Sequence, residues 1–306
     1  MRHKRIRRTP GEAVFNVFNI VLLCIICFVT IFPFWYVLMI SLNDGRDTTL
    51  GGIYFYPRKP TLANYQYVLS QRALRTAYRN TILRTAIGSV LCLMVSGLAA
   101  YSMTKKNLPG RNAVLTYFMI PMFIGGTIVS SYVIIAKLGL LDNFLVYVIP
   151  GAFNFFYMII IRTFMQGIPI SLEESAKIDG ASYYRIFFQL VLPLCMPVVA
   201  TVLLFSGVTY WLDFYTNLLY VAKSNLMVAQ YLLYNVVRAN RMNELTAQQA
   251  WAGGQMTWQV RSSESPLTSE SVKMTVLMVV TLPILVVYPF LQKYFIKGVL
   301  IGALKG

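Results

Sequence analysis

The most distinctive polar residues lie in one stretch between two strongly apolar segments, from Ser171 to Pro197 (SLEESAKIDGASYYRIFFQLVLPLCMP). Ser171 and Glu174 have the spacing of a capping box, in which each side chain satisfies a backbone amide of the other residue, so we predict that a helix begins there. Asp179-Gly180 is expected to end it, because glycine tolerates the positive φ of a sharp reversal. A second helix is expected to follow, and Pro193 and Pro197 are expected to end it. Its apolar face is formed by Tyr183, Ile186, Phe187 and Leu190.

This helix-turn-helix elbow is suited to recognition rather than to catalysis. A short amphipathic helix laid into a groove is a common way for one protein to bind another. Glu173, Glu174 and Asp179 would fix the register of the elbow against basic residues of a partner. We therefore predict that the elbow receives force from another protein at the membrane surface.

Catalytic and metal-binding patterns are missing from the sequence. His3 is the only histidine, which removes histidine-based active sites and metal clusters. The four cysteines lie in or beside apolar runs and are expected to pack as small hydrophobic residues. The sequence contains no G-x-x-x-x-G-K-[ST] loop for nucleotide phosphates, and no H-E-x-x-H or G-x-S-x-G motif. We predict no catalytic residue, no metal and no cofactor in this chain.

The composition is that of an integral membrane protein. Of 306 residues, 57% are hydrophobic and 12% are charged, whereas soluble domains have about half and about a quarter. Six uncharged runs are long enough to cross about 30 Å of hydrocarbon as helices. These runs are residues 13–43, 85–104, 112–136, 143–161, 186–212 and 274–292. The fold class predicted is therefore an all-α membrane protein with six transmembrane helices, with the elbow between the fourth and fifth and a kink in the third at Pro121 and Gly125-Gly126.

The basic residues favour cytoplasmic termini. The net charge of +16 comes from loops between apolar runs, which is typical of charges that set topology and not of a nucleic-acid site. Basic residues are almost equally numerous on the two predicted sides. The patch MRHKRIRR and the short loop from Lys105 to Arg111 weigh most, because long segments cross the membrane largely regardless of charge. Both are predicted to be cytoplasmic.

Two long segments are predicted to be external. The first covers residues 44–84. Its arginines Arg72, Arg75 and Arg79 are interpreted as interfacial anchors. Alternatively, they shape the electrostatic field at the pore mouth and favour an acidic sugar. The second covers residues 213–273, with a helix expected around Leu226 to Val237 and a Ser-rich stretch at 262–266.

Polar residues within the apolar runs are candidates for lining a substrate pathway. Asn154 and Tyr157 are one helical turn apart, and the fifth run ends in a polar and aromatic set. Such residues suit a sugar, which has an apolar C–H face and a rim of hydroxyls, although aromatic residues at a span end are also common interfacial anchors. The predicted pathway residues are Asn154, Tyr157, Thr209, Tyr210, Trp211 and Asp213.

The elbow resembles a known loop. Glu174-Ser175-Ala176, Asp179-Gly180-Ala181 and Leu192-Pro193 are similar to the EAA loop of bacterial ABC-importer permeases, with serine where that family usually has its first alanine. The segment from Phe290 to Gly306 is similar to the tail of MalG-like carbohydrate permeases. The residues that this resemblance implies in ATPase coupling are Glu173, Glu174, Ser175, Ala176, Asp179, Gly180 and Ala181. The implied domains are a basic cytoplasmic N-terminus at 1–12, a first helix at 13–43, a core permease domain at 85–292 with the loop at 171–193, and a cytoplasmic tail at 293–306.

The resemblance also implies partners. Two cytoplasmic ATP-binding subunits would hold ATP and Mg²⁺, a second, related and non-identical permease would complete the pathway, and an extracellular solute-binding protein would deliver an oligosaccharide. The complex would lie in the lipid bilayer of a bacterial cell membrane. Two alternatives stay open, an ABC importer for another solute class and an ion-coupled secondary transporter. The second would favour ionisable residues within the spans, which the six runs lack.

Overall fold

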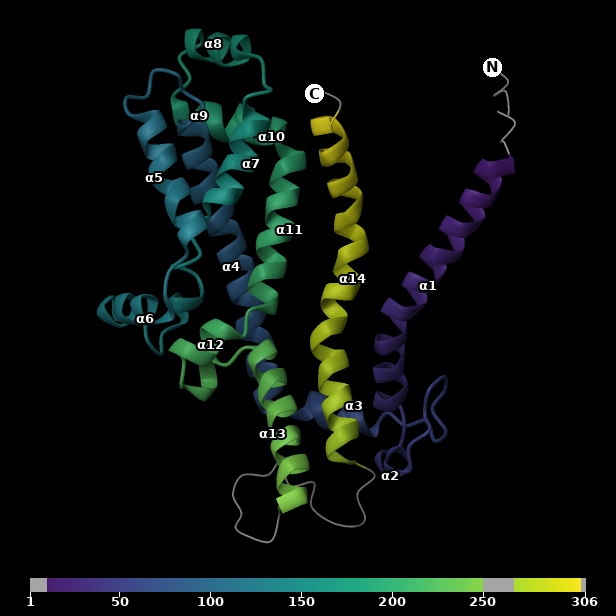
Figure 1. Cartoon of the computed structure of the whole chain (residues 1–306). Helices are drawn as coiled ribbons and strands as arrows, with labels where there is room; N and C mark the ends of the chain where they lie inside the picture. Colours follow the sequence, from purple (N-terminus) through teal and green to yellow (C-terminus); the bar gives the residue numbers. More distant parts are fainter. Residues whose placement is uncertain (1–9, 250–266, 304–306) are drawn as a thin grey trace. The chain divides into compact units, whose positions relative to one another are not determined.

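The computed structural model describes residues 10–249 and 267–303, and the regular elements in these ranges are helices. The chain forms two compact units, of which unit 1 is Met1–Leu69 with Ala239–Val279 and unit 2 is Ser70–Arg238 with Val280–Gly306. Figure 1 shows the helices coloured along the chain. Their bounds are α1 Pro10–Ser41, α2 Gly45–Thr49, α3 Ala63–Ser70, α4 Arg72–Ser102, α5 Arg111–Ile124, α6 Ile128–Lys137, η1 Phe144–Tyr147, α7 Phe155–Met165, α8 Ile170–Ile178, α9 Tyr183–Ile186, η2 Phe187–Val191, α10 Leu192–Leu194, α11 Met196–Leu212, α12 Tyr215–Tyr220, η3 Ser224–Leu226, α13 Ala229–Gln249 and α14 Ser269–Ala303.

Three helices are long and apolar enough to cross a membrane by themselves: α1, α4 and the Ser269–Val287 part of α14. Three bent pairs meet the same criterion when each pair is taken together. These are α5 with α6, α7 with α8, and Tyr183–Leu194 with α11, bent by 120°, 82° and 86°. By length and composition, the described residues therefore provide three to six spans, and the predicted six is the upper value.

Two of the predicted segments fold differently from the expectation. Helix α4 begins at Arg72, so the last part of the predicted external segment 44–84, residues 72–84, belongs to the same helix as the second span. The run 143–161, predicted as one helix, contains η1, an irregular stretch and then α7. Pro150 has no amide to donate within a helix, and the Asn154 side chain accepts a hydrogen bond from the Tyr157 amide and starts α7 anew. The 11 residues of α7 extend over only about 16 Å at 1.5 Å per residue.

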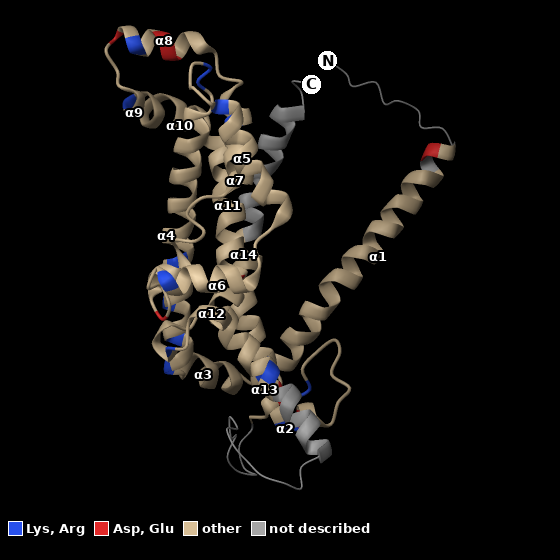
Figure 2. Cartoon of the chain, turned by 60° about the vertical axis from the view of Figure 1, so that its left-hand side comes forward, with Lys and Arg blue, Asp and Glu red and all other residues tan. Residues whose placement is uncertain are grey.

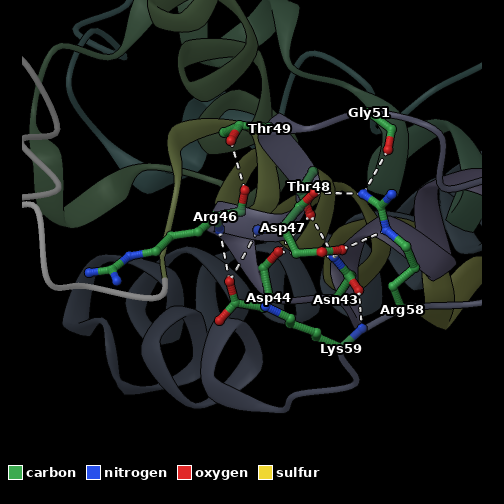
Figure 3. A network of polar contacts seen from close by, with 9 residues as sticks. All are labelled: Asn43, Asp44, Arg46, Asp47, Thr48, Thr49, Gly51, Arg58 and Lys59. Atoms are coloured by element: carbon green, nitrogen blue, oxygen red, sulfur yellow. Dashed lines mark hydrogen bonds and ion pairs between the residues drawn. The ribbon is translucent and has the colours of Figure 1, made fainter.

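Unit 1 contains a polar loop directly after α1, drawn in Figure 3. Asp47 lies at its centre and accepts hydrogen bonds from Asn43 Nδ2 at 3.1 Å and from Arg58 Nε at 2.9 Å. Asn43 Oδ1 accepts from the Lys59 amide at 2.8 Å, which closes the loop. Asp44 caps α2, because its side chain accepts hydrogen bonds from the Arg46 and Asp47 amides. Because these side chains satisfy backbone groups on both arms of the loop, the loop holds a defined shape with a small apolar core.

Unit 2 is built around a bundle in which α4, α5, α7 and α11 lie side by side (Figure 1). Helices α8, α9 and α10 lie at one end, which we call the elbow end, and α6 and α12 lie at the other. Charged residues gather at these two ends, whereas the helices between them carry few (Figure 2). The main core joins α4, α7 and α11 and includes Cys92, Leu93, Met158, Ile161, Phe187, Val198 and Val202.

Glycine and proline residues bend the bundle helices where the sequence predicts it. Gly125 has a φ of 66° and separates α5 from α6, which confirms the kink expected in the third run. Thr127 then caps α6 by accepting from the Ser130 amide. The second sharp bend lies at Cys195, between Pro193 and Pro197, where the chain turns from α10 into α11.

Candidate functional site

The candidate site is the elbow formed by α8, the turn after it and α9. Helix α8 begins at Ile170, directly after Pro169, and no side chain caps its first turn. The capping box predicted between Ser171 and Glu174 is therefore not formed, because both residues already lie within the helix. Proline suits this position, since it has no amide to satisfy and its φ is fixed near −65°.

The turn after α8 has the geometry predicted from Gly180. Its φ of 78° is strained for any residue with a Cβ. The Ala181 amide donates to the Ala176 carbonyl and the Gly180 amide donates to the Lys177 carbonyl, both at 3.0 Å. This pair of bonds is a Schellman motif, which satisfies the last carbonyls of a helix and fixes the direction in which the chain leaves it. Ser182 then caps α9 by accepting from the Arg185 amide.

Helix α8 has two different faces. Glu173 and Ala176 are half-buried, and Ala176 packs with Ala181 against the main core of the bundle. Ile178 is 87% exposed on the other face. Four of the predicted coupling residues are exposed with it, namely Glu174, Ser175, Asp179 and Gly180. The elbow thus holds to its own bundle by one side and leaves the other side open.

Glu173 does not lie on the open face. Its carboxylate forms an ion pair with Lys105 Nζ, just beyond the end of α4, and Tyr101 OH donates to the same oxygen at 3.4 Å. The Lys105 ammonium also lies 3.9 Å from the centre of the Tyr101 ring. A cavity of about 450 Å³ adjoins this contact and is lined by residues of the α4 end and of α9. The predicted role of Glu173 in contacting a partner protein is not supported by this position, because its carboxylate is already engaged within the chain.

The two predicted pathway residues at the start of α7 differ in their exposure to solvent. Asn154 is exposed at the start of α7, and its amide donates to Ser96 Oγ at 3.1 Å. Tyr157 is only 9% exposed and belongs to the main core. The two residues therefore do not form one accessible polar face.

The predicted pathway residues at the end of α11 also point in different directions. Thr209 is exposed, and its hydroxyl donates to a carbonyl of its own helix. The Tyr210 side chain is held closely by two glycines, because a Cβ on Gly88 would lie 2.6 Å from Tyr210 Cζ and a Cβ on Gly151 would clash with Tyr210 Oη. Trp211 Nε1 donates to the Val280 carbonyl at 3.3 Å. Its side chain lines a mostly apolar cavity of about 390 Å³ between α4, α11 and α14.

The last predicted pathway residue, Asp213, pairs with a residue that the sequence analysis placed in the external segment. Arg84 is fully buried within α4, and its Nη1 lies 3.4 Å from Asp213 Oδ2. Its Nη2 donates to the Asp213 carbonyl, and the guanidinium lies 5.1 Å from the Tyr147 ring centre. Asp213 Oδ1 also accepts hydrogen bonds from the Tyr215 and Thr216 amides at the start of α12. The only sequence signal for this pair was that Arg84 and Asp213 flank predicted spans on the same side.

The described residues contain no cluster of three or more His, Cys, Asp or Glu side chains that could hold a metal ion. Of the predicted site residues, the structure brings those of the elbow together. Of the predicted pathway residues, Tyr157 and Tyr210 both pack in the main core, whereas Asn154 and Thr209 are exposed. The elbow is a rigid projection with one open face, a geometry suited to binding a partner rather than to bond chemistry.

Comparison with known proteins gives a consistent result. The family model for the binding-protein-dependent transport system inner membrane component matches residues 8–301. Protein LplC of Bacillus subtilis (strain 168) is 36% identical over 97% of this chain and 97% of its own length. The polygalacturonan/rhamnogalacturonan transport system permease protein YtcP of the same organism is 34% identical over 91% of this chain and 93% of its own length.

A solved structure is similar over almost the whole fold. It is the crystal structure of a bacterial ABC transporter involved in the import of the acidic polysaccharide alginate, and one of its chains superposes with a TM-score of 0.82 at 25% identity. The match covers 95% of this chain and 99% of that chain. With the family match over nearly all residues and relatives above 30% identity, this chain belongs to the family of inner membrane components of binding-protein-dependent transport systems.

Proposed function

We propose that this chain is one of two membrane subunits of an ABC importer that takes up oligosaccharides. Subunits of this family carry the solute, while separate subunits hydrolyse ATP. The oligosaccharide class is supported by relatives such as the permease named for polygalacturonan and rhamnogalacturonan. The observation that carries the proposal is the elbow, which projects an open face from the end of an apolar bundle.

In the proposed arrangement the chain crosses the membrane six times. The spans are α1, α4, the three bent pairs and α14, and both termini and the elbow end face the cytoplasm. The basic patch before α1 and the loop between α4 and α5 support this orientation by the positive-inside rule. A second, related permease, two ATP-binding subunits that hold ATP and Mg²⁺, and an extracellular solute-binding protein complete the importer.

The elbow would work as a rigid lever. When the ATP-binding subunits close on ATP, the open face of α8 moves with them, and the Schellman turn at Gly180 transmits that movement instead of absorbing it. The bundle then changes from inward-facing to outward-facing and accepts the solute from its binding protein. Hydrolysis resets the complex.

A direct test is photo-crosslinking from the two faces of α8 in the intact complex. A photoreactive residue at Ile178, which is 87% exposed, should crosslink to a co-purifying P-loop ATPase. The same residue at Ala176, which faces the bundle, is the matched control and should crosslink within the chain. If Ile178 reported only lipid, or if the chain transported solute alone with an ion gradient as its energy source, the proposal would be wrong.

The arginines at the start of α4 favour an acidic saccharide within this class. Arg72, Arg75 and Arg79 are exposed at the end of unit 2 opposite the elbow, and their spacing places them along one side of the helix. None of them forms an ion pair with a described carboxylate. Polygalacturonan and alginate, for which two of the similar proteins are named, are both chains of uronic acids.

Uptake of fluorescent oligogalacturonides and of neutral maltooligosaccharides of equal length tests this refinement. Cells that express the wild-type importer should prefer the acidic chains. Replacing Arg72, Arg75 and Arg79 with glutamine should slow uptake of the acidic chains and weaken its dependence on salt, because the steering field is removed. A preference for the neutral chains, or equal losses for both, would contradict it.

A further inference from the structure

The contact between Glu173 and Lys105 joins two elements that are far apart in sequence. Glu173 lies in the first turn of α8, and Lys105 lies in the turn that follows α4. Both side chains are largely shielded from solvent, with 16% and 26% of their surfaces exposed. Among the side chains that the structure describes, this is the one ion pair that joins α8 to another part of the chain.

Aromatic rings surround this pair and restrict it. Lys105 Nζ lies 3.9 Å from the Tyr101 ring centre and 5.9 Å from that of Tyr183 in α9. Lys177, one turn after Glu173 on the same side of α8, lies 4.9 Å from the Tyr183 ring centre. A charge pair with such shielding is screened less by salt than an exposed pair, and cation–π contacts add to its attraction.

The α4 side of the contact is connected along the whole bundle. Arg162 Nε, at the end of α7, donates to the Met103 carbonyl just past the end of α4 at 3.1 Å. Tyr101 packs on Phe187 with ring centres 5.5 Å apart. Further along, α4 packs against both α7 and α11 through the main core. A displacement of Lys105 therefore reaches the helices of the bundle through packed side chains.

Apart from the pair of Glu173 and Lys105, the attachments of α8 to the bundle are weak. The residues that hold α8 to the bundle besides Glu173 are small, chiefly Ala176 and the nearby Ala181. The cavity of about 450 Å³ beside the contact means that part of the space between the elbow and the end of α4 is not filled by side chains. Without a specific tie, α8 could move relative to α4.

We propose that Glu173 and Lys105 are a positioning pair that makes α8 and α4 move together. The inference rests on the proposed function, because it assigns to this pair the transfer of movement from the elbow to the substrate-carrying helices. Glu173 is thus separated in role from Glu174 and Asp179, which stay on the open face for the partner. The pair acts through position and does not contact solute or nucleotide.

Charge reversal in the complete importer, reconstituted with its ATP-binding subunits and binding protein, tests the inference. Glu173→Lys and Lys105→Glu should each lower the solute taken up per ATP hydrolysed by about tenfold, within the usual range of coupling between sites. The double variant restores opposite charges and should recover most of the coupling. Lys106→Glu makes the same charge change at the exposed next residue, and it should behave like wild type.

A merely structural role would lower the amount of complex without changing the solute-to-ATP ratio, so both quantities are measured. If a single reversal does not accumulate, Glu173→Gln removes the charge at nearly constant shape and is read in the same assay. Wild-type coupling in both single variants, or no recovery in the double variant, would overturn the inference. A wild-type chain that binds no ATPase would overturn the proposed function first, and the role of the pair with it.

Discussion

Replacing Tyr210 with phenylalanine should stabilise the protein, although tyrosine was predicted to serve the substrate pathway. The Tyr210 hydroxyl is buried and has no hydrogen-bond partner among the described residues. A buried hydroxyl without a partner costs about 1–3 kcal/mol relative to its hydrated state. Its removal leaves the ring in the same place, so we expect a gain of about 1 kcal/mol. For a chain of this size, that gain corresponds to a rise in Tm of about 2 °C.

The same geometry makes a second, linked prediction at Gly151. A Cβ at this position would clash with Tyr210 Oη but would lie 3.1 Å from Tyr210 Cζ. Gly151→Ala should therefore cost about 1–3 kcal/mol in the wild type, as overpacking does. In the Tyr210→Phe background the nearest contact is the ring carbon, so the cost should fall by at least half. Gly126→Ala is the control, because its Cβ would meet Ser131 Oγ at an ordinary 3.7 Å.

The assay is a double-mutant cycle on the detergent-solubilised complex, with Tm read by the loss of the monodisperse peak in size-exclusion chromatography after heating. Uptake is measured for the same variants. Our reasoning is refuted if Tyr210→Phe lowers Tm, or if it abolishes uptake by a stable complex, since either result means that the hydroxyl has a partner or binds solute. An equal cost of Gly151→Ala in both backgrounds would show that the hydroxyl is not the clashing atom.

Three further predictions concern the turn, the buried arginine and the loop of unit 1. Gly180→Val should uncouple ATP hydrolysis from uptake and lower the stability of the folded protein by about 1–2 kcal/mol, whereas Gly180→Asn should be nearly neutral. A Cβ at this position meets no atom within 4 Å, so the effect comes from the φ of 78° alone. Normal transport by the valine variant would contradict this prediction. Asp213→Ala should cost about 3–5 kcal/mol by leaving the Arg84 charge buried alone, with Arg84→Met expected to be much milder in the same thermal assay. The pKa of Asp47 lies below its ordinary 3.8, because Asn43 and Arg58 donate hydrogen bonds to the charged carboxylate. As the pH falls, the unfolded chain therefore binds a proton at Asp47 before the native protein does, so the contribution of Asp47 to stability is complete above pH 3.8 and is lost as the pH falls through the lower native pKa. Asp47→Asn should flatten the curve of Tm against pH in that range.

The elbow was largely predictable because its signals are local. The turn at Gly180 follows from a backbone conformation that favours glycine, and the apolar spacing of Tyr183, Ile186 and Phe187 indicates the next helix. The N-cap of α8 was predicted at Ser171, two residues after the observed N-cap Pro169, because the capping-box pattern was given more weight than the fixed φ of the proline. The segment 262–266 and the first nine residues lie outside the described residues, so the structure does not test the predictions for them.

The exposure of the predicted pathway residues could not be predicted from the sequence, because spacing along one helix does not say which neighbour covers each face. Tyr157 and Tyr210 have the composition of a sugar site, yet the approach of α4 and of Gly88 encloses them. Arg84 stands next to an uncharged run and reads as a loop charge, yet it becomes a fully buried partner of Asp213 only when α4 meets the end of α11.

Hydrophobicity and backbone preferences act within one segment, so residue types and spacing were enough to indicate a helical membrane protein with an elbow between two spans. Burial and pairing depend on residues far apart in the chain, such as Lys105 and Glu173. Which charge of the elbow faces its own bundle and which charges lie on the open face became visible in the folded chain alone, because the elements that pack around the elbow make that choice.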